Sequence, residues 1–286
     1  MYCAVTPTQA QPASNQYKQF LIRLNFCLLF IGAVSMLQAQ TPELWGMTPN
    51  GGGNSYGTMF KTDANGNNHS VVETFLGNTG RNPYGSLIQA ANGKLYGMTQ
   101  NGGANNYGVL FEYDLNTSTY TNKLDFDGAL KGSYPFGSIM QAANGKLYGM
   151  TRQGGTSGNG VLFEYDPYTS TYTKKLDFDG ASKGRVPYGN LIQTTNGKLY
   201  GMTRYGGTSG NGVLFEYDPS TGTYTKKLDF DGTSKGRYPL GSLMQAANGS
   251  LYGMTHQGGT NNLGVLFEYT PSTGTYTKKL DFDGTS

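Results

Sequence analysis

Cysteine, histidine and charged residues are scarce in this chain of 286 residues. Both cysteines, Cys3 and Cys27, lie near the N-terminus, and charged residues make up only 14% of the sequence. The 21 basic residues nearly balance the 18 acidic ones, which argues against a nucleic-acid partner because such proteins carry a strong basic footprint. Few charges together with many aromatic residues also argue against intrinsic disorder, which requires high net charge and low hydrophobicity.

Glycine, tyrosine and phenylalanine are abundant instead. The chain contains 44 glycines, 22 tyrosines and 14 phenylalanines. Glycine supplies the positive φ angles of tight turns, whereas aromatic and β-branched residues favour strands. The composition therefore predicts an all-β protein of many short strands, and the chain is long enough to bury a sizeable core.

The first 39 residues have the pattern of a secretory signal peptide. A positively charged start is followed by an apolar run at Phe26–Leu37 and then by the small residue Ala39. The run is shorter than the roughly 20 residues of a membrane span, and a buried core segment is the alternative. We predict that residues 1–39 are cleaved and that the mature chain, 40–286, is secreted or displayed at the cell surface without a membrane span. Cleavage would remove both cysteines, which excludes disulfides, thiolate metal sites and a cysteine nucleophile.

From residue 44 onward the sequence repeats with a period of 52 residues. The phrase Leu-Tyr-Gly-Met-Thr recurs at this spacing, and a variant with tryptophan begins 51 residues before the first copy. Such repetition indicates an array of similar supersecondary units. The phrase begins at Leu44, Leu95, Leu147, Leu199 and Leu251, which divides the chain into repeats 44–94, 95–146, 147–198, 199–250 and the partial repeat 251–286.

Each repeat has the pattern of four short antiparallel strands. In the last copy they span 241–246, 251–255, 265–269 and 276–282, separated by two tight turns and one long glycine-rich loop. Four strands about every 50 residues is the period of a β-propeller blade. We predict a β-propeller of four-stranded antiparallel blades, with five blades visible and the completeness of the ring left open. A parallel β-helix is the structural alternative.

Paired lysines recur on the fourth predicted strand, which lies at the outer edge of a propeller blade. Charge on an edge strand discourages edge-to-edge pairing with other chains, and this is our interpretation of the lysines. A basic strip that binds a partner is the alternative. The pairs are Lys174-Lys175, Lys226-Lys227 and Lys278-Lys279.

These motifs resemble two repeat families. The aromatic residues around an Asp-Pro-Ser-Thr turn and the Gly-Gly doublet are similar to a kelch blade, although Tyr224 and its equivalents stand where kelch repeats have tryptophan. The sequence resembles more closely the bacterial GloVer (Gloeobacter/Verrucomicrobia) tandem repeat, over residues 44–286. The resemblance implies a secreted or surface-attached repeat protein without an established enzymatic role. The motifs that carry it are Leu199–Thr203, Gly206-Gly207, Gly212–Phe215, Phe230–Gly232 and Pro239–Met244.

The sequence predicts no catalytic residue, no metal site and no cofactor. His69 and His256 occupy different positions of the repeat, so a histidine-based site would need partners from distant blades. The recurring Asp-Phe-Asp-Gly motif lacks the alternating oxygen ligands of a calcium loop, and we interpret its carboxylates as strand-end residues. The Gly-Gly doublets lack the lysine and the following helix of a phosphate-binding loop.

One face of the predicted propeller carries candidate binding residues. Strand alternation places the loops between the second and third strands on the same face as the loops between blades, and functional residues are common on such loops. The two residues before each Gly-Gly doublet vary between nearly identical copies, and the loops between blades add arginines. The candidates for ligand binding are Arg152, Gln153, Arg204, Tyr205, His256, Gln257, Arg185 and Arg237.

We therefore predict a binding module that uses this face, with an anionic glycan or another surface protein as its partner. Unconstrained drift at exposed loop positions is the alternative explanation of the variable residues. A purely structural or adhesive scaffold is the second functional hypothesis. A carbohydrate-active hydrolase or lyase with a site at the propeller channel is the third.

Overall fold

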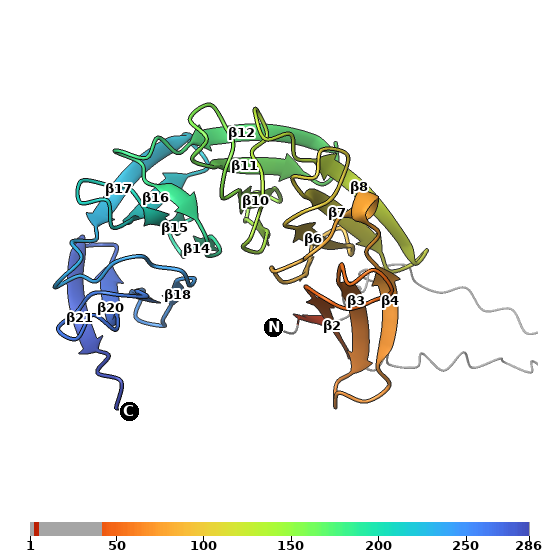
Figure 1. The fold of residues 1–286 in the computed structure, drawn as a ribbon, viewed down its shortest axis with the longest axis horizontal. Coiled ribbons are helices and arrows are strands. Elements are labelled where there is room, and N and C mark those ends of the chain that lie inside the picture. The colour runs from red at the N-terminus through yellow and green to blue at the C-terminus, as the bar shows by residue number, and fades with distance from the viewer. Residues whose placement is uncertain (1–2, 6–41, 286) are drawn as a thin grey trace, which may run out of the picture.

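Residues 3–5 and 42–285 are described by a computed structural model, in which this part of the chain is all-β apart from one short 3-10 helix. Five antiparallel sheets follow one another along the chain and stand side by side in an arc (Figure 1). Each sheet is one propeller blade, with its first strand toward the inside of the arc and its last strand on the outer rim. The arc leaves a gap between the first and the last blade (Figure 1). The predicted all-β propeller architecture is confirmed.

The blades are numbered from the N-terminus. Blade 1 contains β1 (Cys3–Val5), β2 (Glu43–Thr48), β3 (Thr58–Asp63) and β4 (Ser70–Thr74), and the 3-10 helix η1 (Gly77–Thr79) follows it. Blade 2 contains β5 (Ile88–Gln89), β6 (Leu95–Thr99), β7 (Val109–Asp114) and β8 (Thr119–Asp125). Blade 3 contains β9 (Met140–Gln141), β10 (Leu147–Met150), β11 (Val161–Asp166) and β12 (Thr171–Asp177). Blade 4 contains β13 (Arg185–Pro187), β14 (Ile192–Gln193), β15 (Leu199–Tyr205), β16 (Val213–Asp218) and β17 (Thr223–Asp229). Blade 5 contains β18 (Met244–Gln245), β19 (Leu251–Met254), β20 (Val265–Thr270) and β21 (Thr275–Asp281).

The innermost strands are shorter than the sequence predicts. In blade 5 the predicted strand 241–246 is reduced to β18, because only Met244 and Gln245 pair with β19. The other three strands of this blade agree with the predicted ranges to within one residue. Blade 4 gains an extra short strand, β13, which pairs with the far end of an extended β15.

Blade 1 takes its innermost strand from the N-terminal segment, since β1 pairs antiparallel with β2. This strand lies within the predicted signal peptide, 1–39, whose other residues fall outside the described part of the chain. Cleavage stays a prediction, and it would remove β1 and leave β2 as the innermost strand of blade 1. No helical segment among the described residues has the length and hydrophobicity needed to cross a membrane.

The Leu-Tyr-Gly-Met-Thr motif needs its glycine because a phenylalanine ring lies over it. A Cβ atom added at Gly201 would stand 2.6 Å from Cζ of Phe215 and 2.9 Å from Cδ2 of Leu191. The ring of Phe215 is fully buried and also stacks against Tyr224 on the outer strand, with 5.5 Å between the ring centroids. The glycine thus leaves room for the aromatic residues that fill the blade.

Neighbouring blades pack face to face through apolar side chains. Tyr200, Met202 and Phe230 of blade 4 are buried in one cluster with Phe267 of blade 5, and equivalent residues pack at the other junctions. The outward face of blade 5 is uncovered, so that Met254 is 53% exposed whereas its counterpart Met202 is 3% exposed. The main apolar contact between neighbouring blades is therefore the packing of these side chains against the next blade.

The Asp-Phe-Asp-Gly motif at the end of the outer strand forms hydrogen bonds with two long loops, one within the blade and one that leads to the next blade. In blade 4, Asp229 accepts hydrogen bonds from the backbone N–H (2.9 Å) and the hydroxyl (3.1 Å) of Thr208, in the loop between β15 and β16. Asp231 accepts a hydrogen bond from the backbone N–H of Lys235 (2.8 Å), in the loop to the next blade. Phe230 between them is fully buried. Backbone N–H groups thus hold both of these carboxylates.

A Tyr–Glu–Lys network repeats in blades 2, 3 and 4. In blade 4 the hydroxyl of Tyr200 donates to Glu216, and Nζ of Lys198 lies 3.2 Å from the same carboxylate. Burial raises the pKa of Tyr200. Burial alone would also raise the pKa of Glu216, but the hydrogen bonds from Tyr200 and Lys198 outweigh it and hold that pKa below its usual value. Because the network recurs from blade to blade, we interpret it as structural.

The paired lysines lie on the edge strands β12, β17 and β21, as predicted. In β17, Nζ of Lys226 is 2.6 Å from Asp229 and Nζ of Lys227 is 3.6 Å from Glu216. The pairs in β12 and β21 also lie within 3.6 Å of carboxylates of their own blades. These lysines are thus neutralised locally, which argues against the alternative of a basic binding strip.

We expect the Gly201→Ala variant to be less stable than the wild type, because the added methyl group overlaps the ring of Phe215. Overpacking of this kind costs about 1–3 kcal/mol. The matched control is Gly241→Ala, whose Cβ would meet no atom within 4 Å. Urea unfolding followed by circular dichroism should give a lower free energy of unfolding for Gly201→Ala alone. Equal stability of the two variants would contradict this packing role.

We expect stability to fall on both sides of neutral pH. Burial alone would raise the pKa of Asp229 and of Asp231, but hydrogen bonds hold both below their usual values, as they do for Glu216. Groups whose pKa is lowered by folding stabilise the protein above their unfolded pKa of about 4, and this stability is lost as the pH falls through the folded pKa. Tyr200, whose pKa folding raises, stabilises the protein below about pH 10, and its contribution is lost as the pH rises further.

Urea unfolding across the pH range tests this expectation, with a maximum free energy of unfolding between about pH 5 and pH 9. The Glu216→Gln variant should lose less stability on acidification than the wild type, because one of the titrating carboxylates is absent. A wild-type stability that stays constant from neutral to strongly acidic pH would show that these carboxylates do not contribute as inferred.

Candidate functional site

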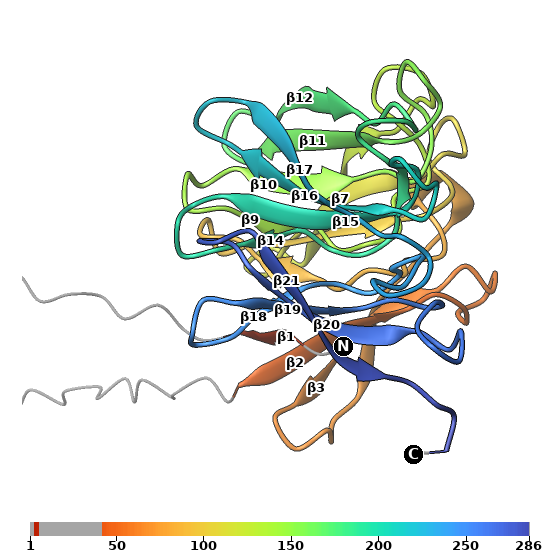
Figure 2. The same cartoon turned by 90° about the vertical axis from the view of Figure 1, so that its left-hand side faces the viewer.

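Two sets of loops form one side of the arc, which we call the long-loop face (Figure 2). One set connects the two middle strands of each blade (β2–β3, β6–β7, β10–β11, β15–β16 and β19–β20), and the other connects successive blades. Backbone hydrogen bonds join them, since the N–H of Arg237 donates to the carbonyl of Gln257 (2.7 Å) and the N–H of Gln257 donates to that of Arg237 (3.2 Å). In blade 4, Arg185 in β13 pairs with Tyr205 at the end of β15. The predicted meeting of both loop sets on one face is confirmed.

Two arginines from neighbouring blades lie against one tyrosine ring on this face. Cζ of Arg152, in the loop that follows β10, is 4.4 Å from the ring centroid of Tyr188. Cζ of Arg204, near the end of β15, is 5.3 Å from the same centroid. A guanidinium within about 6 Å of an aromatic ring is attracted by the ring's negative face. Tyr188 therefore helps to hold the two cations near each other.

Further aromatic rings extend this arrangement on both sides. The ring of Phe136 lies 4.8 Å from that of Tyr188 and 5.7 Å from Cζ of Arg152. On the other side, the ring of Tyr205 lies 4.8 Å from Cζ of Arg204. Cations and rings thus alternate across blades 3 and 4. We call this set the arginine–aromatic cluster: Phe136, Arg152, Arg185, Tyr188, Arg204 and Tyr205.

The arginines of the cluster lack acidic partners. Within residues 42–285, no carboxylate oxygen lies within 4.0 Å of Arg152, Arg185 or Arg204, and their side chains make no hydrogen bond. The Nε atoms of Arg152 and Arg204 are buried without a partner there. Most buried polar atoms in proteins are hydrogen-bonded. The long-loop face therefore carries three arginine charges that no neighbouring carboxylate compensates, an arrangement that attracts anions.

The other four candidate residues lie on the same face but outside the cluster. The guanidinium of Arg237 donates a hydrogen bond to the side chain of Asn262 (3.0 Å). The remaining three side chains make no hydrogen bond with the described residues: Gln153, His256 and Gln257. The structure thus brings together Arg152, Arg185, Arg204 and Tyr205. Arg237, which lies over the ring of Tyr238 (5.3 Å), and its neighbours His256 and Gln257 lie at the next junction, and Gln153 lies apart from both groups.

Sequence reasoning missed the aromatic members Phe136 and Tyr188. Both directly follow a proline in a loop between blades, 52 residues apart. The same Pro-aromatic pair occurs at Pro83-Tyr84, and its recurrence was a signal for an aromatic row on this face. The row ends at Leu240, which takes the aromatic position in the next copy.

Metal-binding geometry is absent from the described residues, since no three His, Cys, Asp or Glu side chains gather there. The two histidines lie apart, with His69 preceding β4 of blade 1 and His256 following β19 of blade 5. The ring of His69 packs against Phe60, with 5.3 Å between the centroids. The guanidinium groups of the arginine–aromatic cluster can attract a negatively charged group.

Several solved structures are similar in fold. The extracellular domain of a one-component system from B. thetaiotaomicron matches with a TM-score of 0.59 and 18% identity, over 85% of this chain and 27% of that chain. TolB from Acinetobacter baumannii matches with a TM-score of 0.51 and 14% identity, over 82% of this chain and 52% of TolB. A puromycin hydrolase matches with a TM-score of 0.54 and 12% identity, over 84% of this chain and 37% of the hydrolase. At these identities the similarity shows the propeller-like fold alone, and this chain spans only part of each protein.

No curated protein matches the chain. A family model for the Gloeobacter/Verrucomicrobia repeat matches it over residues 14–194 and again over residues 131–286. Both matches contain copies of the 52-residue unit that forms the blades. The chain belongs to the Gloeobacter/Verrucomicrobia repeat family.

Proposed function

We propose that this protein is a binding module that captures an anionic ligand on its long-loop face, at the arginine–aromatic cluster. The observation that carries the proposal is the pair Arg152 and Arg204, which lie against one ring, Tyr188, without a carboxylate partner. Drift at exposed loop positions would place arginines there without regard to their neighbours. Here they share a ring that comes from a third segment of the chain, which supports a site.

A guanidinium recognises an oxyanion through two parallel N–H groups, so each arginine can bind a carboxylate or a sulfate bidentately. Two of them on adjacent blades suit a ligand with more than one negative group. The aromatic rings restrict the arginine side chains before binding, which lowers the entropy lost on association. The aspartates of the Asp-Phe-Asp-Gly motif hold the long loops through hydrogen bonds, as when Asp229 accepts from the backbone N–H of Thr208. The cluster is therefore preorganised.

An acidic glycan is the ligand class that these features favour. The rings of Phe136, Tyr188 and Tyr205 are partly exposed beside the arginines, and they offer apolar surface to a sugar ring while the guanidinium groups meet its acidic substituents. We infer an exported location at or outside the cell surface from the signal-peptide pattern of residues 1–39. The one-component system that shares this fold was solved as an extracellular domain, which agrees with that location.

We propose a non-catalytic role. The cluster pairs cations with aromatic rings and contains no nucleophile next to a base, the arrangement by which covalent catalysis is recognised. A scaffold or adhesive role without a specific ligand is the competing hypothesis, and a measurement of ligand affinity separates the two.

The Arg152→Ala/Arg204→Ala variant should bind an acidic polysaccharide at least tenfold more weakly than the wild type, because two charge-assisted contacts are lost. Polygalacturonate is the probe, with neutral dextran as the ligand control, and isothermal titration calorimetry measures the affinity. Lys174→Ala/Lys226→Ala is the matched protein control, since it removes the same charge from the outer rim. Binding should also weaken as salt is raised.

Equal affinity of the arginine variant and the wild type would show that the arginine–aromatic cluster is not the binding site. Absence of any polygalacturonate binding by the wild type would favour the scaffold hypothesis. Retention of affinity in an Arg152→Lys/Arg204→Lys variant would show that charge alone suffices, without the bidentate geometry of the guanidinium.

The Tyr188→Ala variant should bind the same probe several-fold more weakly although its net charge is unchanged, because both arginines lose the ring that restricts them. Tyr84→Ala is the control, since Tyr84 occupies the same repeat position and stacks on Phe136 without an arginine over it. Calorimetry should show the loss mainly as a less favourable entropy. A Tyr84→Ala variant that weakens binding as much as Tyr188→Ala would argue against a specific role for Tyr188.

A further inference from the structure

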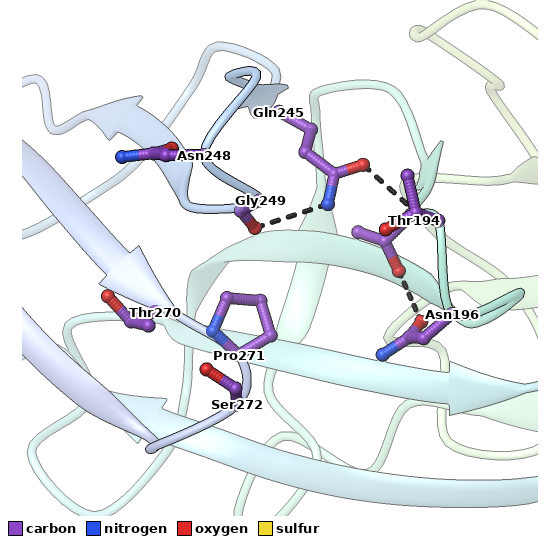
Figure 3. Close-up of a pocket in the computed structure, with 9 residues that line it drawn as sticks. Thr194, Asn196, Gln245, Asn248, Gly249, Thr270, Pro271 and Ser272 are labelled. Carbon is purple, nitrogen blue, oxygen red and sulfur yellow. Dashed lines mark hydrogen bonds between the residues drawn. The ribbon is translucent and has the colours of Figure 1, made fainter.

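A pocket of about 270 Å³ lies between blades 4 and 5 (Figure 3). The turns that line it join the strands at the ends opposite the long loops, so the pocket lies on the other side of the arc from the long-loop face. One wall is the turn between β14 and β15, residues 194–196. The other wall comes from blade 5, where Gln245, the turn at 248–249 and the turn at 270–272 line the space. The tight turns of all the blades lie on this side of the arc. The pocket occupies the junction between blades 4 and 5.

Two separate departures from the repeat meet at this pocket. The first is in blade 4, where Thr194 and Thr195 replace the Ala-Ala pair that begins the same turn in the other copies. The second is in blade 5, where Ser250 and Thr270 stand in place of a lysine and an aspartate. Thr270 lines the pocket, and Ser250 lies behind it in contact with its hydroxyl. Drift in single copies would scatter such changes over the propeller. Here both add hydroxyl groups at one junction.

The loss of the Lys–Asp pair makes the pocket neutral. In blade 3, Lys146 forms an ion pair with Asp166 at this corner, and the equivalent lysines and aspartates of blades 2 and 4 lie 3.4 and 4.0 Å apart. In blade 5 the two hydroxyl oxygens of Ser250 and Thr270 are 3.3 Å apart instead. None of the nine side chains that line the pocket is charged. A charged ligand that entered this pocket would lose its hydration and find no side chain of opposite charge, which is costly.

Hydrogen bonds hold the walls of the pocket in place. The side chain of Gln245 spans the junction, because its Oε1 accepts from the backbone N–H of Thr195 (3.2 Å) and its Nε2 donates to the carbonyl of Gly249 (3.1 Å), as Figure 3 shows. The hydroxyl of Thr194 donates to Asn196 (2.5 Å). The rigid part of the site is thus built from amide groups whose positions are fixed before a ligand binds.

Free polar groups and an apolar ring remain for a ligand. The hydroxyls of Thr195 and Ser272 make no hydrogen bond with any described residue. Each hydroxyl can act as donor or acceptor. The ring of Pro271 stands among these side chains and supplies a flat apolar surface (Figure 3). Hydroxyl and amide groups around an apolar patch match the two faces of a sugar ring.

We propose that this pocket binds one sugar residue of a neutral glycan, separately from the anionic site on the long-loop face. Its volume is just below the roughly 300–1,000 Å³ of pockets that take drug-sized ligands, so one ring fits and a longer oligosaccharide must extend outward. The two sites lie on opposite sides of the arc, and one protein can therefore hold an acidic and a neutral glycan at once.

Saturation-transfer-difference NMR tests the proposal on the full chain, with the methyl glycosides of glucose, galactose, mannose and N-acetylglucosamine as probes. At least one should give a saturable signal with the wild type. The Ser250→Lys/Thr270→Asp variant should weaken that binding at least tenfold, because it restores the ion pair of the other blades and charges the pocket wall. This variant should fold normally, since blades 2, 3 and 4 carry the same pair, and circular dichroism checks that it does.

Two further variants sharpen the result. Thr195→Ala, which restores the residue found in the other copies, should weaken binding several-fold. Lys146→Ser/Asp166→Thr makes the same exchange of residue types in blade 3 and should bind the probe as the wild type does. No signal from any of the four neutral sugars, or wild-type affinity in Ser250→Lys/Thr270→Asp, would overturn the proposal and leave a crevice that holds water only. Polygalacturonate binding is read out separately and bears on the long-loop site alone.

Discussion

The long loops of this propeller depend on aspartates. These carboxylates accept hydrogen bonds from loop N–H groups that have no partner in a neighbouring strand. Long glycine-rich loops leave N–H groups without a ladder partner, and a backbone group buried without a hydrogen bond is costly. In each of blades 2 to 5 the carboxylate at the end of the outer strand, such as Asp177 or Asp229, accepts a hydrogen bond from the loop between the two middle strands. In blade 4 the second carboxylate, Asp231, does the same for the loop to the next blade. One short motif therefore fixes the two loop sets that carry the arginines.

Charge is divided between structure and recognition in a consistent way. The lysines of the outer strands and the buried glutamates pair within their own blade, as Lys227 and Glu216 do. Titratable groups with shifted pKa values often mark active sites, but structural ion-pair networks shift them as well. Glu216 belongs to the second kind, because the same contacts recur in blade after blade. Arg152 and Arg204 differ from it, since no described carboxylate neutralises them.

The sequence was sufficient for the features that depend on periodicity. The 52-residue spacing, the strand alternation and the shared face of the long loops follow from the order of residues, and the structure has them all. The role of Tyr188 could not be predicted, because its contact with Arg152 joins loops of different blades and depends on how far each loop bends. The length of the innermost strand also depends on packing near the inside of the arc, and β18 keeps two residues where the alternation continues for six.

Near-identical repeats supply their own internal comparison, and position in space decides what a difference between copies means. The side chains of Gln153, His256 and Gln257 make no hydrogen bond with the described residues, although the backbone of Gln153 and of Gln257 pairs with the loop between blades, so only the backbone at these positions is constrained. Thr195 and Thr270 also depart from the repeat, yet they come from different blades and line one pocket. Departures from a repeat that converge across a blade junction need a common cause, and recognition of one ligand is such a cause. In a repeat array, a residue that departs from the repeat therefore indicates a binding site when its neighbour in space, from another blade, departs from the repeat as well.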